Sequence, residues 1–302
     1  MNLSCPICGN KEGIRESYVK KIHPKADVKY NNLFYVCCPK CLTYFQAPFP
    51  DKAQYMEILN DTKGVAFEYF SHDFLEKPQS ELNDALDGMY RLMQDLKDKY
   101  KLKGSIFDVG YGVGEFVYKL NLLGFSAEGI EPSKIGIEHC RKRGVGEDMV
   151  KNVLITDYSF THQFEIVTLL NSWETLYNPI EVLDICIKQL TPNGFLVIKT
   201  QTLIDGFWES VPVGELFRPF NLFVMETGNL VKLLQAKGLE VQVVNPTRPC
   251  VIVGRKSGTP SQISIGDLLS QTENKNQSTE KVTNTHEPGQ SMEIMKDGSS
   301  RI

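Results

Sequence analysis

The sequence predicts an α/β fold, a largely parallel β-sheet covered by helices, with a small cysteine-rich module in front of it. Three observations support this. From residue 105 onward, short β-branched runs alternate with helical stretches, as they do in parallel sheets. The last two apolar runs, 239–244 and 251–254, are joined by a turn too short for a parallel crossover. Two Cys-x-x-Cys pairs also stand within the first 41 residues.

Composition limits the class of protein. The 302 residues, of which 41% are hydrophobic, suffice for one substantial core and a smaller module. A formal charge of −4 gives no general attraction for a nucleic acid or an anionic membrane. No apolar run approaches the length of a membrane span and the N-terminus lacks a signal-peptide pattern. We therefore expect no membrane span and a cytoplasmic protein, whose clustered cysteines bind metal.

Hydrophobic periodicity divides the chain into segments. Strands of the parallel type are predicted at 105–109, 126–130, 150–155, 165–170 and 195–200. Helices are predicted at about 113–123, 133–143, 179–190 and 227–237. Apolar residues at helical spacing predict a helical linker or lid over residues 51–103. Residues 257–302 are polar and contain no aromatic residue, which predicts a disordered tail.

A glycine-rich turn follows the first predicted strand. Its glycines, Gly110, Gly112 and Gly114, allow the backbone to turn tightly and to approach a ligand closely. The dinucleotide-binding fingerprint would place a third glycine or an alanine at position 115, where this chain has Glu115. A carboxylate at this helix N-terminus would repel a pyrophosphate, so the turn favours a ligand without phosphate.

Glu131 ends the second predicted strand. It stands 21 residues after Gly110, where a carboxylate can accept hydrogen bonds from both ribose hydroxyls. S-adenosylmethionine has a ribose and no phosphate, so the glycine turn and Glu131 together predict this cofactor. The alternative is a tight turn that binds nothing, with a solvent-exposed Glu131.

Five segments resemble, in order, the motifs of class I methyltransferases that use S-adenosylmethionine, especially the ubiquinone-biosynthesis and polysaccharide-associated branches. They are Asp108–Gly114, Gly129–Ser133, Phe164–Leu170, Trp173–Pro179 and Leu190–Ile198. The resemblance implies a Rossmann-like seven-stranded sheet with a C-terminal β-hairpin and an S-adenosylmethionine-binding domain over residues 104–256.

The resemblance also implies roles for individual residues. Asp108 and the glycine turn would hold the methionine part of the cofactor, and Glu131 would hold the ribose. Asp157 and Tyr158 would contact the adenine, and Asn171 would line the pocket beside the sulfonium.

The catalytic base is the point at which the chain departs from its relatives. Many of them carry a histidine in a Leu-Glu-His-Leu-x-Asp-Pro motif, where this chain has Thr175. Glu174 is then the carboxylate nearest the expected reaction centre and the candidate catalytic residue, although it equally fits a capping or pairing role in its turn. His72, which could reach over the pocket, and Arg218, which could bind an anionic acceptor, each also fit a structural role.

The cysteine pairs predict a metal site. Cys5, Cys8, Cys38 and Cys41 form two knuckles whose four thiolates can bind one tetrahedral zinc ion and leave no open position, so the metal is expected to be structural. Cys37 is an alternative ligand to Cys38, and a redox pair or unliganded cysteines are the other interpretations. Residues 1–50 resemble the zinc ribbon that precedes the catalytic domain of some sugar- and polysaccharide-related methyltransferases.

These features lead to one main functional hypothesis and two alternatives. We expect a methyltransferase that transfers a methyl group, at oxygen, to a small-molecule or glycan-linked acceptor. An RNA substrate is the second hypothesis, because a similar ribbon precedes certain ribosomal-RNA guanine methyltransferases. Residues 1–50 carry seven Lys and Arg against three Asp and Glu, a local charge of +4. The third, motivated by the missing histidine, is a non-catalytic cofactor-binding interaction protein.

Overall fold

The computed structural model describes residues 3–16, 34–60, 79–142, 144–146, 148–203, 221–246 and 249–257. The predicted tail beyond residue 257, and the candidates His72 and Arg218, lie outside the described residues. None of the helices in the described part of the chain is both long enough and apolar enough to cross a membrane.

A seven-stranded sheet forms the centre of the described structure, with the order β11-β12-β8-β7-β4-β5-β6. Its parallel strands are β4 (Ser105–Val109), β5 (Ser126–Ile130), β6 (Val150–Lys151), β7 (Phe164–Leu170) and β8 (Leu190–Thr200). The antiparallel hairpin is β11 (Leu239–Asn245) and β12 (Cys250–Lys256). The predicted fold class is confirmed. The strand order reverses between β4 and β7, and ligands of open α/β sheets bind at such a switch point.

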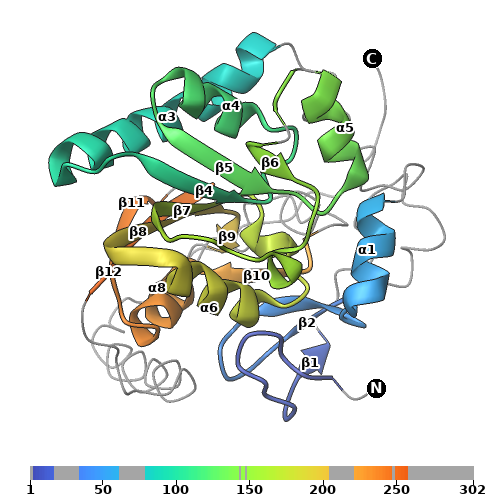
Figure 1. Cartoon of the computed structure of the whole chain (residues 1–302). Helices are drawn as coiled ribbons and strands as arrows, with labels where there is room; N and C mark the ends of the chain where they lie inside the picture. Colours follow the sequence, from blue (N-terminus) through green and yellow to red (C-terminus); the bar gives the residue numbers. More distant parts are fainter. Residues whose placement is uncertain are drawn as a thin grey trace, which may run out of the picture. The chain divides into compact units, whose positions relative to one another are not determined.

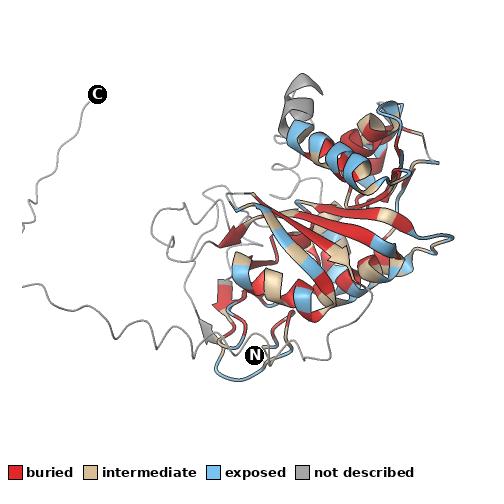
Figure 2. Ribbon diagram, turned by 90° about the vertical axis from the view of Figure 1, so that its left-hand side faces the viewer, coloured by how far each residue is buried: buried red, intermediate tan, exposed pale blue. Residues whose placement is uncertain are grey.

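Helices cover both faces of this sheet (Figure 1). On one side lie α3 (Gln79–Tyr100), α4 (Glu115–Leu122) and α5 (Lys134–Lys142). On the other lie α6 (Pro179–Gln189) and α8 (Thr227–Ala236). Alternate strand residues point to opposite faces, so Ile106 packs in the core under α3–α5 and its neighbour Phe107 packs in the other core. Figure 2 shows buried residues along the strands and exposed ones on the outer helix surfaces.

The third parallel strand is shorter than predicted. We expected residues 150–155, whereas β6 ends at Lys151 and a 3-10 turn covers Ile155–Asp157. Asn152 explains the early end, because its side-chain amide donates to the carbonyl oxygens of Glu131, at 2.8 Å, and Ser133, at 3.2 Å. The chain therefore turns towards the loop after β5 instead of continuing the sheet.

The cysteine module, residues 3–16 and 34–50, belongs to a second sheet that also includes strands from far along the chain. In the described residues this sheet has the order β1-β2-β3-β10-β9. Its strands are β1 (Arg15–Glu16), β2 (Phe34–Cys37), β3 (Tyr44–Ala47), β9 (Thr202–Leu203) and β10 (Phe223–Glu226). Val36 and Phe45 share one hydrophobic core with Leu169 and Ile198 of the large sheet. The module thus does not close on itself, and the domain boundaries predicted at residues 50, 103 and 256 stay predictions.

Candidate functional site

A cavity of about 270 Å³ lies at the carboxyl ends of β4, β5, β7 and β8. Its walls are mostly apolar, with a few polar and charged side chains among them. Of the residues predicted to bind the cofactor, those that line it are Asp108, Gly110, Gly112, Glu131 and Asn171. The structure therefore brings together the residues predicted for the methionine and ribose parts of the cofactor.

The glycine turn crosses the cavity floor with backbone angles that favour glycine. Gly110 has φ 80° and Gly114 has φ 78°. A Cβ atom on Gly110 would lie 2.7 Å from Cβ of Ser172, and one on Gly114 would lie 2.5 Å from Sγ of Cys140. Both positions therefore require glycine for backbone conformation and for packing.

Glu131 is held at the end of β5 by two backbone donors. The amide of Gly112 donates to Oε2 at 3.1 Å, and the amide of Ser133 donates to Oε1 at 2.9 Å. The side chain is buried, and burial raises its pKa to about 7 although the two amides oppose the shift. Each carboxylate oxygen keeps lone pairs for a ligand, which is what recognition of two ribose hydroxyls requires.

Asp108 lies on the neighbouring strand β4. The hydroxyl of Thr168 on β7 donates to its Oδ1 at 2.5 Å. Asp108 is buried, and burial raises its pKa to about 7 against the effect of this hydrogen bond. Two carboxyl groups on adjacent strands thus face a mainly apolar cavity, where a cationic or hydroxyl-bearing ligand would stabilise their ionised forms.

Asn171 follows β7 in a left-handed conformation with φ 56°, which asparagine tolerates better than most residues. Its backbone amide donates to the carbonyl oxygen of Lys199 on β8 at 2.6 Å. Asn171 and Lys199 therefore lie side by side where the two strands meet the cavity.

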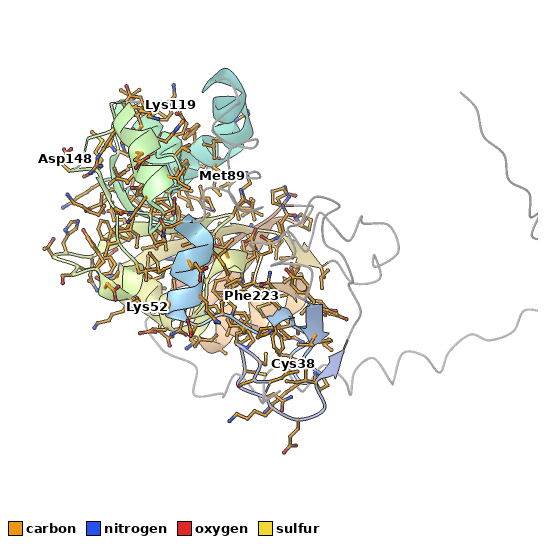
Figure 3. All side chains as sticks on the ribbon, turned by 90° about the vertical axis from the view of Figure 1, so that its right-hand side faces the viewer. Cys38, Lys52, Met89, Lys119, Asp148 and Phe223 are labelled. Atoms are coloured by element: carbon orange, nitrogen blue, oxygen red, sulfur yellow. The ribbon has the colours of Figure 1, made fainter. Side chains whose placement is uncertain are left out.

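Asp157 and Tyr158, predicted at the adenine, do not line the cavity. Asp157 is exposed and accepts from Nζ of Lys52 at 2.7 Å, on the helix α1 (Lys52–Asn60) seen in Figure 3. Tyr158 packs on Phe107, with ring centroids 5.6 Å apart. The three preceding residues, 154–156, line the cavity instead. They carry no motif, so the sequence offered no signal for them, and the adenine contacts of Asp157 and Tyr158 stay a prediction.

Glu174 is likewise absent from the cavity wall. It lies in the short turn η3 (Trp173–Thr175) and is buried. The hydroxyl of Thr200 donates to its Oε2 at 2.5 Å. Its neighbour Thr175, at the position where relatives carry the histidine, does line the cavity. The catalytic role of Glu174 stays a prediction. Its hydrogen bond with Thr200 is a contact of the kind expected from the alternative, a pairing role within the turn.

Several other wall residues lie outside the recognised motifs and were not predicted from the sequence. Tyr55 and Leu59 of α1, Leu86 of α3, and Lys199 of β8 line the cavity. For α1 and α3 the only available signal was helical periodicity, which locates a helix but not the side of it that faces a ligand.

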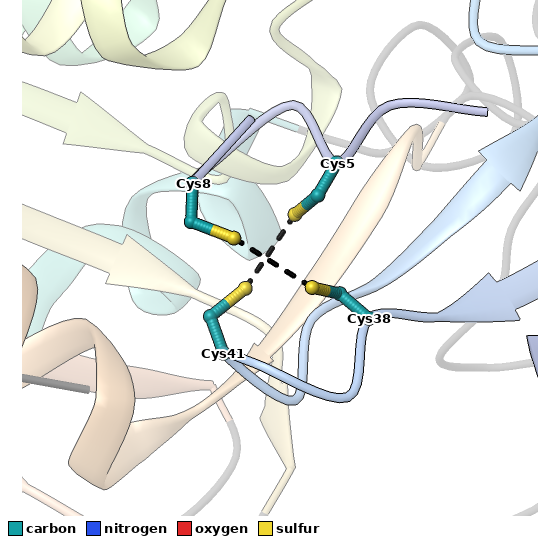
Figure 4. A group of neighbouring side chains, drawn as sticks. All are labelled: Cys5, Cys8, Cys38 and Cys41. Carbon is teal, nitrogen blue, oxygen red and sulfur yellow. Dashed lines mark hydrogen bonds between the residues drawn. The ribbon is translucent and has the colours of Figure 1, made fainter. Parts of the chain in front are cut away.

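The four predicted metal ligands converge on one point (Figure 4). Sγ of Cys5 lies 3.5 Å from Sγ of Cys41, and Sγ of Cys8 lies 3.6 Å from Sγ of Cys38. All four sulfur atoms lie within 4.8 Å of one another. A zinc ion with Zn–S bonds of about 2.3 Å separates its sulfur ligands by roughly 3.8 Å, so the cluster fits a tetrahedral metal. Cys37 is not part of this cluster among the described residues.

The loops around the cluster have the form of two metal knuckles. Gly9 and Leu42, each following the second cysteine of a pair, have φ of 71° and 51°. The amide of Gly9 donates to the carbonyl of Cys5, and that of Leu42 donates to the carbonyl of Cys38, both at 2.9 Å. Leu42 therefore takes the left-handed conformation without being glycine. Hydrogen bonds among the four thiols lower the pKa of Cys38 but raise the pKa of Cys5, whereas a bound metal would take all four as thiolates.

Hydrogen bonds link the cysteine module to the cavity wall. The backbone amide of Gln46 on β3 donates to the carbonyl of Leu222 at 2.8 Å, and the amide of Leu222 donates to the carbonyl of Glu174 at 2.8 Å. The ring of Phe223 on β10, labelled in Figure 3, packs edge-to-face on Trp173 with centroids 5.4 Å apart. The module that carries the metal cluster is therefore linked to the turn η3 through Leu222 and Phe223.

A comparison with protein-family models matches residues 82–244, more than half of the chain, to a methyltransferase domain. The matched range contains the glycine turn, Glu131 and Asn171, and thus the cavity floor. A search of curated proteins found no significant match.

Solved structures of methyltransferases share the fold. One is magnesium protoporphyrin IX methyltransferase from Synechocystis PCC 6803 with bound SAH, with TM-score 0.53 and 13% identity over 68% of this chain and 100% of the other. Another is the plantazolicin methyltransferase BpumL in complex with a pentazolic desmethylPZN analog and SAH. It has TM-score 0.50 and 14% identity over 67% of this chain and 94% of the other. Family match, seven-stranded sheet and cavity agree: the chain belongs to the methyltransferase-domain family and is a class I, S-adenosylmethionine-dependent methyltransferase.

Proposed function

We propose that this methyltransferase acts at an oxygen of a small-molecule or glycan-linked acceptor and carries a structural zinc ion in its N-terminal module. The observation that carries the first part is the cavity, whose walls are mostly apolar with a few polar groups among them. Such a site suits a small acceptor whose reactive group enters beside the cofactor. The names of the two structural neighbours, a magnesium protoporphyrin IX and a plantazolicin methyltransferase, also refer to no nucleic acid.

The residues at the floor of the cavity fit S-adenosylmethionine. When bound, the cofactor supplies a methyl group on a positively charged sulfur. Glu131 would accept the ribose hydroxyls, and Asp108 with the glycine turn would hold the methionine part. Asn171 would line the cavity beside the sulfonium. The two buried carboxyl groups suit a cation, and Glu115, buried at the N-terminus of α4, disfavours a phosphate there.

The protein's contribution to the reaction would be mainly positioning. In-line methyl transfer needs the acceptor oxygen about 3 Å from the methyl carbon in the right orientation, and orientation alone supplies much of the acceleration. Apolar wall residues would exclude water, and the hydroxyl-bearing residues Thr175 and Tyr177 line the cavity near η3. These hydroxyls can orient an acceptor without acting as strong bases.

A labelled-methyl assay tests the proposal. Purified protein is incubated with S-adenosylmethionine carrying a labelled methyl group and with panels of hydroxyl-bearing metabolites, nucleotide sugars, amines and total RNA. Label transferred to an oxygen of a metabolite or sugar supports the proposal. Label found only in RNA, with binding that weakens as salt rises, contradicts it and supports the RNA alternative.

The Glu174→Gln variant tests the predicted base. A glutamine oxygen can still accept the hydrogen bond from Thr200, but it cannot accept a proton at neutral pH. Because Glu174 does not line the cavity, we expect kcat of the variant to stay within about threefold of the parent. Its melting temperature should fall, because the new NH2 group meets the backbone amide of Gln201, which donates to Oε1 at 3.5 Å. A fall in kcat of a hundredfold or more, with unchanged cofactor affinity, would instead establish Glu174 as the base.

A further inference from the structure

Tyr55 is a wall residue that no sequence motif marks. It lies on α1, which precedes the residues matched to the methyltransferase domain, and it is buried where it lines the cavity. Its ring packs on the ring of Tyr177, with centroids 5.0 Å apart. The segment between the cysteine module and the matched domain therefore contributes a phenol group to the cavity.

Two contacts hold α1 beside the cavity. In its first turn, Nζ of Lys52 donates to Oδ1 of Asp157 at 2.7 Å. At its other end, the backbone amide of Lys134 donates to Oδ1 of Asn60 at 3.0 Å. The first partner lies in the 3-10 turn after β6, and the second at the start of α5. Both ends of the helix are thus attached to the main sheet region, which gives Tyr55 a defined place in the wall.

The hydroxyl of Tyr55 is paired with that of Thr175. The two side chains are hydrogen-bonded to each other, and the Thr175 hydroxyl donates to the carbonyl oxygen of Ser172 at 2.8 Å. Because a hydroxyl has only one proton, Tyr55 is the donor within the pair, and its oxygen keeps lone pairs for an O–H group of a ligand. Burial raises the pKa of Tyr55, so this hydroxyl stays neutral at physiological pH.

The hydroxyl pair lies beside the part of the cavity proposed for the ribose and the sulfonium. Thr175 belongs to η3, which closely follows Asn171, the residue proposed beside the sulfonium. On the other side, the charge of Glu131, the proposed ribose ligand, contributes to the raised pKa of Tyr55 and so acts on its hydroxyl. An acceptor must place its oxygen in this part of the cavity to reach the methyl group.

We propose that Tyr55 is an acceptor-binding residue, whose oxygen accepts a hydrogen bond from the acceptor hydroxyl and thereby orients the acceptor oxygen. The inference rests on the proposed function, methyl transfer to an oxygen. The neutral phenol takes no proton from the acceptor, so its contribution is binding and orientation. Thr175 fixes the direction of the phenol O–H and acts through Tyr55 as a positioning residue.

The Tyr55→Phe variant tests the inference, because it keeps the ring beside Tyr177 and removes only the hydroxyl. The probes are S-adenosylhomocysteine and the mixture of hydroxyl-bearing metabolites and nucleotide sugars from the labelled-methyl assay; each compound that the parent labels is then measured singly. We expect kcat/KM to fall about tenfold, while Kd for S-adenosylhomocysteine stays within twofold. Tyr118→Phe, on α4 outside the cavity wall, is the control and should change neither quantity.

A double-mutant cycle with Thr175→Val separates a joint role of the two hydroxyls from two independent ones. Thr175→Val should lower kcat/KM in the same direction, and the double variant should lose no more than Tyr55→Phe alone, because the two hydroxyls act as one unit. Thermal melting establishes that each variant is folded, and Thr175→Val decides the question by the same two measurements should Tyr55→Phe not fold.

Three results would overturn the inference. They are an equal loss of S-adenosylhomocysteine affinity, which would make Tyr55 a cofactor ligand, an unchanged kcat/KM for every labelled compound, and additive losses in the double variant. Failure of the proposed function is distinguishable, because the parent protein would then label no hydroxyl compound or only RNA, and the inference would fall with it.

Discussion

The Cys38→Ser variant is expected to lose its metal and to unfold at a clearly lower temperature than the parent protein. Cys38 is one of four sulfurs that converge within 4.8 Å, and a structural zinc site contributes its binding free energy to folding. Loss of such a site should cost at least about 3 kcal/mol of unfolding free energy, or roughly 10 °C in melting temperature. Metal analysis should give about one zinc per parent chain and little in the variant.

The neighbouring Cys37 provides the matched control. It lies next to Cys38 in sequence but outside the sulfur cluster, so Cys37→Ser should keep both the metal and the melting temperature. Stoichiometric zinc in Cys38→Ser, or equal metal loss in both variants, would contradict the assignment of the ligands.

The same variant should weaken cofactor binding, because the module supports the cavity wall. β3 and β10 connect the cysteine knuckle to η3 through the backbone of Leu222, and Ser172, Thr175 and Tyr177 around η3 line the cavity. Titration with S-adenosylhomocysteine at a temperature where both proteins are folded should therefore show a higher Kd for Cys38→Ser. Unchanged affinity would mean that the wall holds its shape without the metal.

The second large effect is expected for Glu131→Gln. The carboxylate would accept two hydroxyl hydrogen bonds while both of its oxygens are already held by backbone amides. The side-chain NH2 group of glutamine is a donor and cannot accept a hydrogen bond. It would therefore lose the hydrogen bond from one backbone amide and the hydrogen bond from one ribose hydroxyl. With about 1.5–3 kcal/mol for each hydrogen bond to a charged group, we expect Kd for S-adenosylmethionine to rise a hundredfold or more. Glu138→Gln, at an exposed position of α5, is the control and should bind as the parent does.

The pH dependence of binding follows from the raised pKa of Glu131. Burial raises it from 4.5 to about 7 in the unliganded protein, so below pH 7 a proton must leave before the carboxylate can accept both hydroxyls. Because the pKa of Asp108 is also raised to about 7, affinity should fall by up to roughly a hundredfold per pH unit as pH drops below 7, and Glu131→Gln should reduce this slope to roughly tenfold per pH unit. The sign is opposite for stability: the folded state binds the proton more tightly, so this group lowers the unfolding free energy as pH rises from about 4.5 towards 7.

Local sequence signals predicted the parallel part of the fold closely. β4 and β5 have the predicted bounds because β4 runs into the glycine turn and β5 ends just before Glu131 and Pro132. Turn chemistry at such points restricts the backbone strongly, so the end of the strand is visible in the sequence. The same signals located Gly110, Gly112 and Glu131, and the structure brings all three to one cavity.

Long-range pairing was the part that local patterns could not predict. β10 is a four-residue strand whose partners are β3, more than 170 residues earlier, and the two-residue strand β9. A short, mostly apolar run of this kind fits a strand or a buried helix turn equally well, and only its tertiary partner decides. For this reason the sequence did not predict that β10, from the methyltransferase part of the chain, pairs with β3 of the cysteine module.

Side-chain direction limited the prediction of the site. Asp157 accepts a hydrogen bond from Lys52, while Ile155 and Thr156 just before it line the cavity, and the adenine contact of Asp157 stays a prediction. In a 3-10 turn, neighbouring residues point in very different directions, so a displacement of one residue moves a side chain off the wall. Lys199 was overlooked for a related reason, since an isolated lysine at a strand end carries no sequence motif.

Calorimetric titration of the metal-loaded protein with S-adenosylmethionine and, separately, with NAD tests the central claim most directly. Both ligands contain adenine and ribose, but only NAD carries a pyrophosphate, which Glu115 at the start of α4 would repel. The account predicts saturable binding of one S-adenosylmethionine per chain and no detectable binding of NAD. Binding of NAD without binding of S-adenosylmethionine would contradict it.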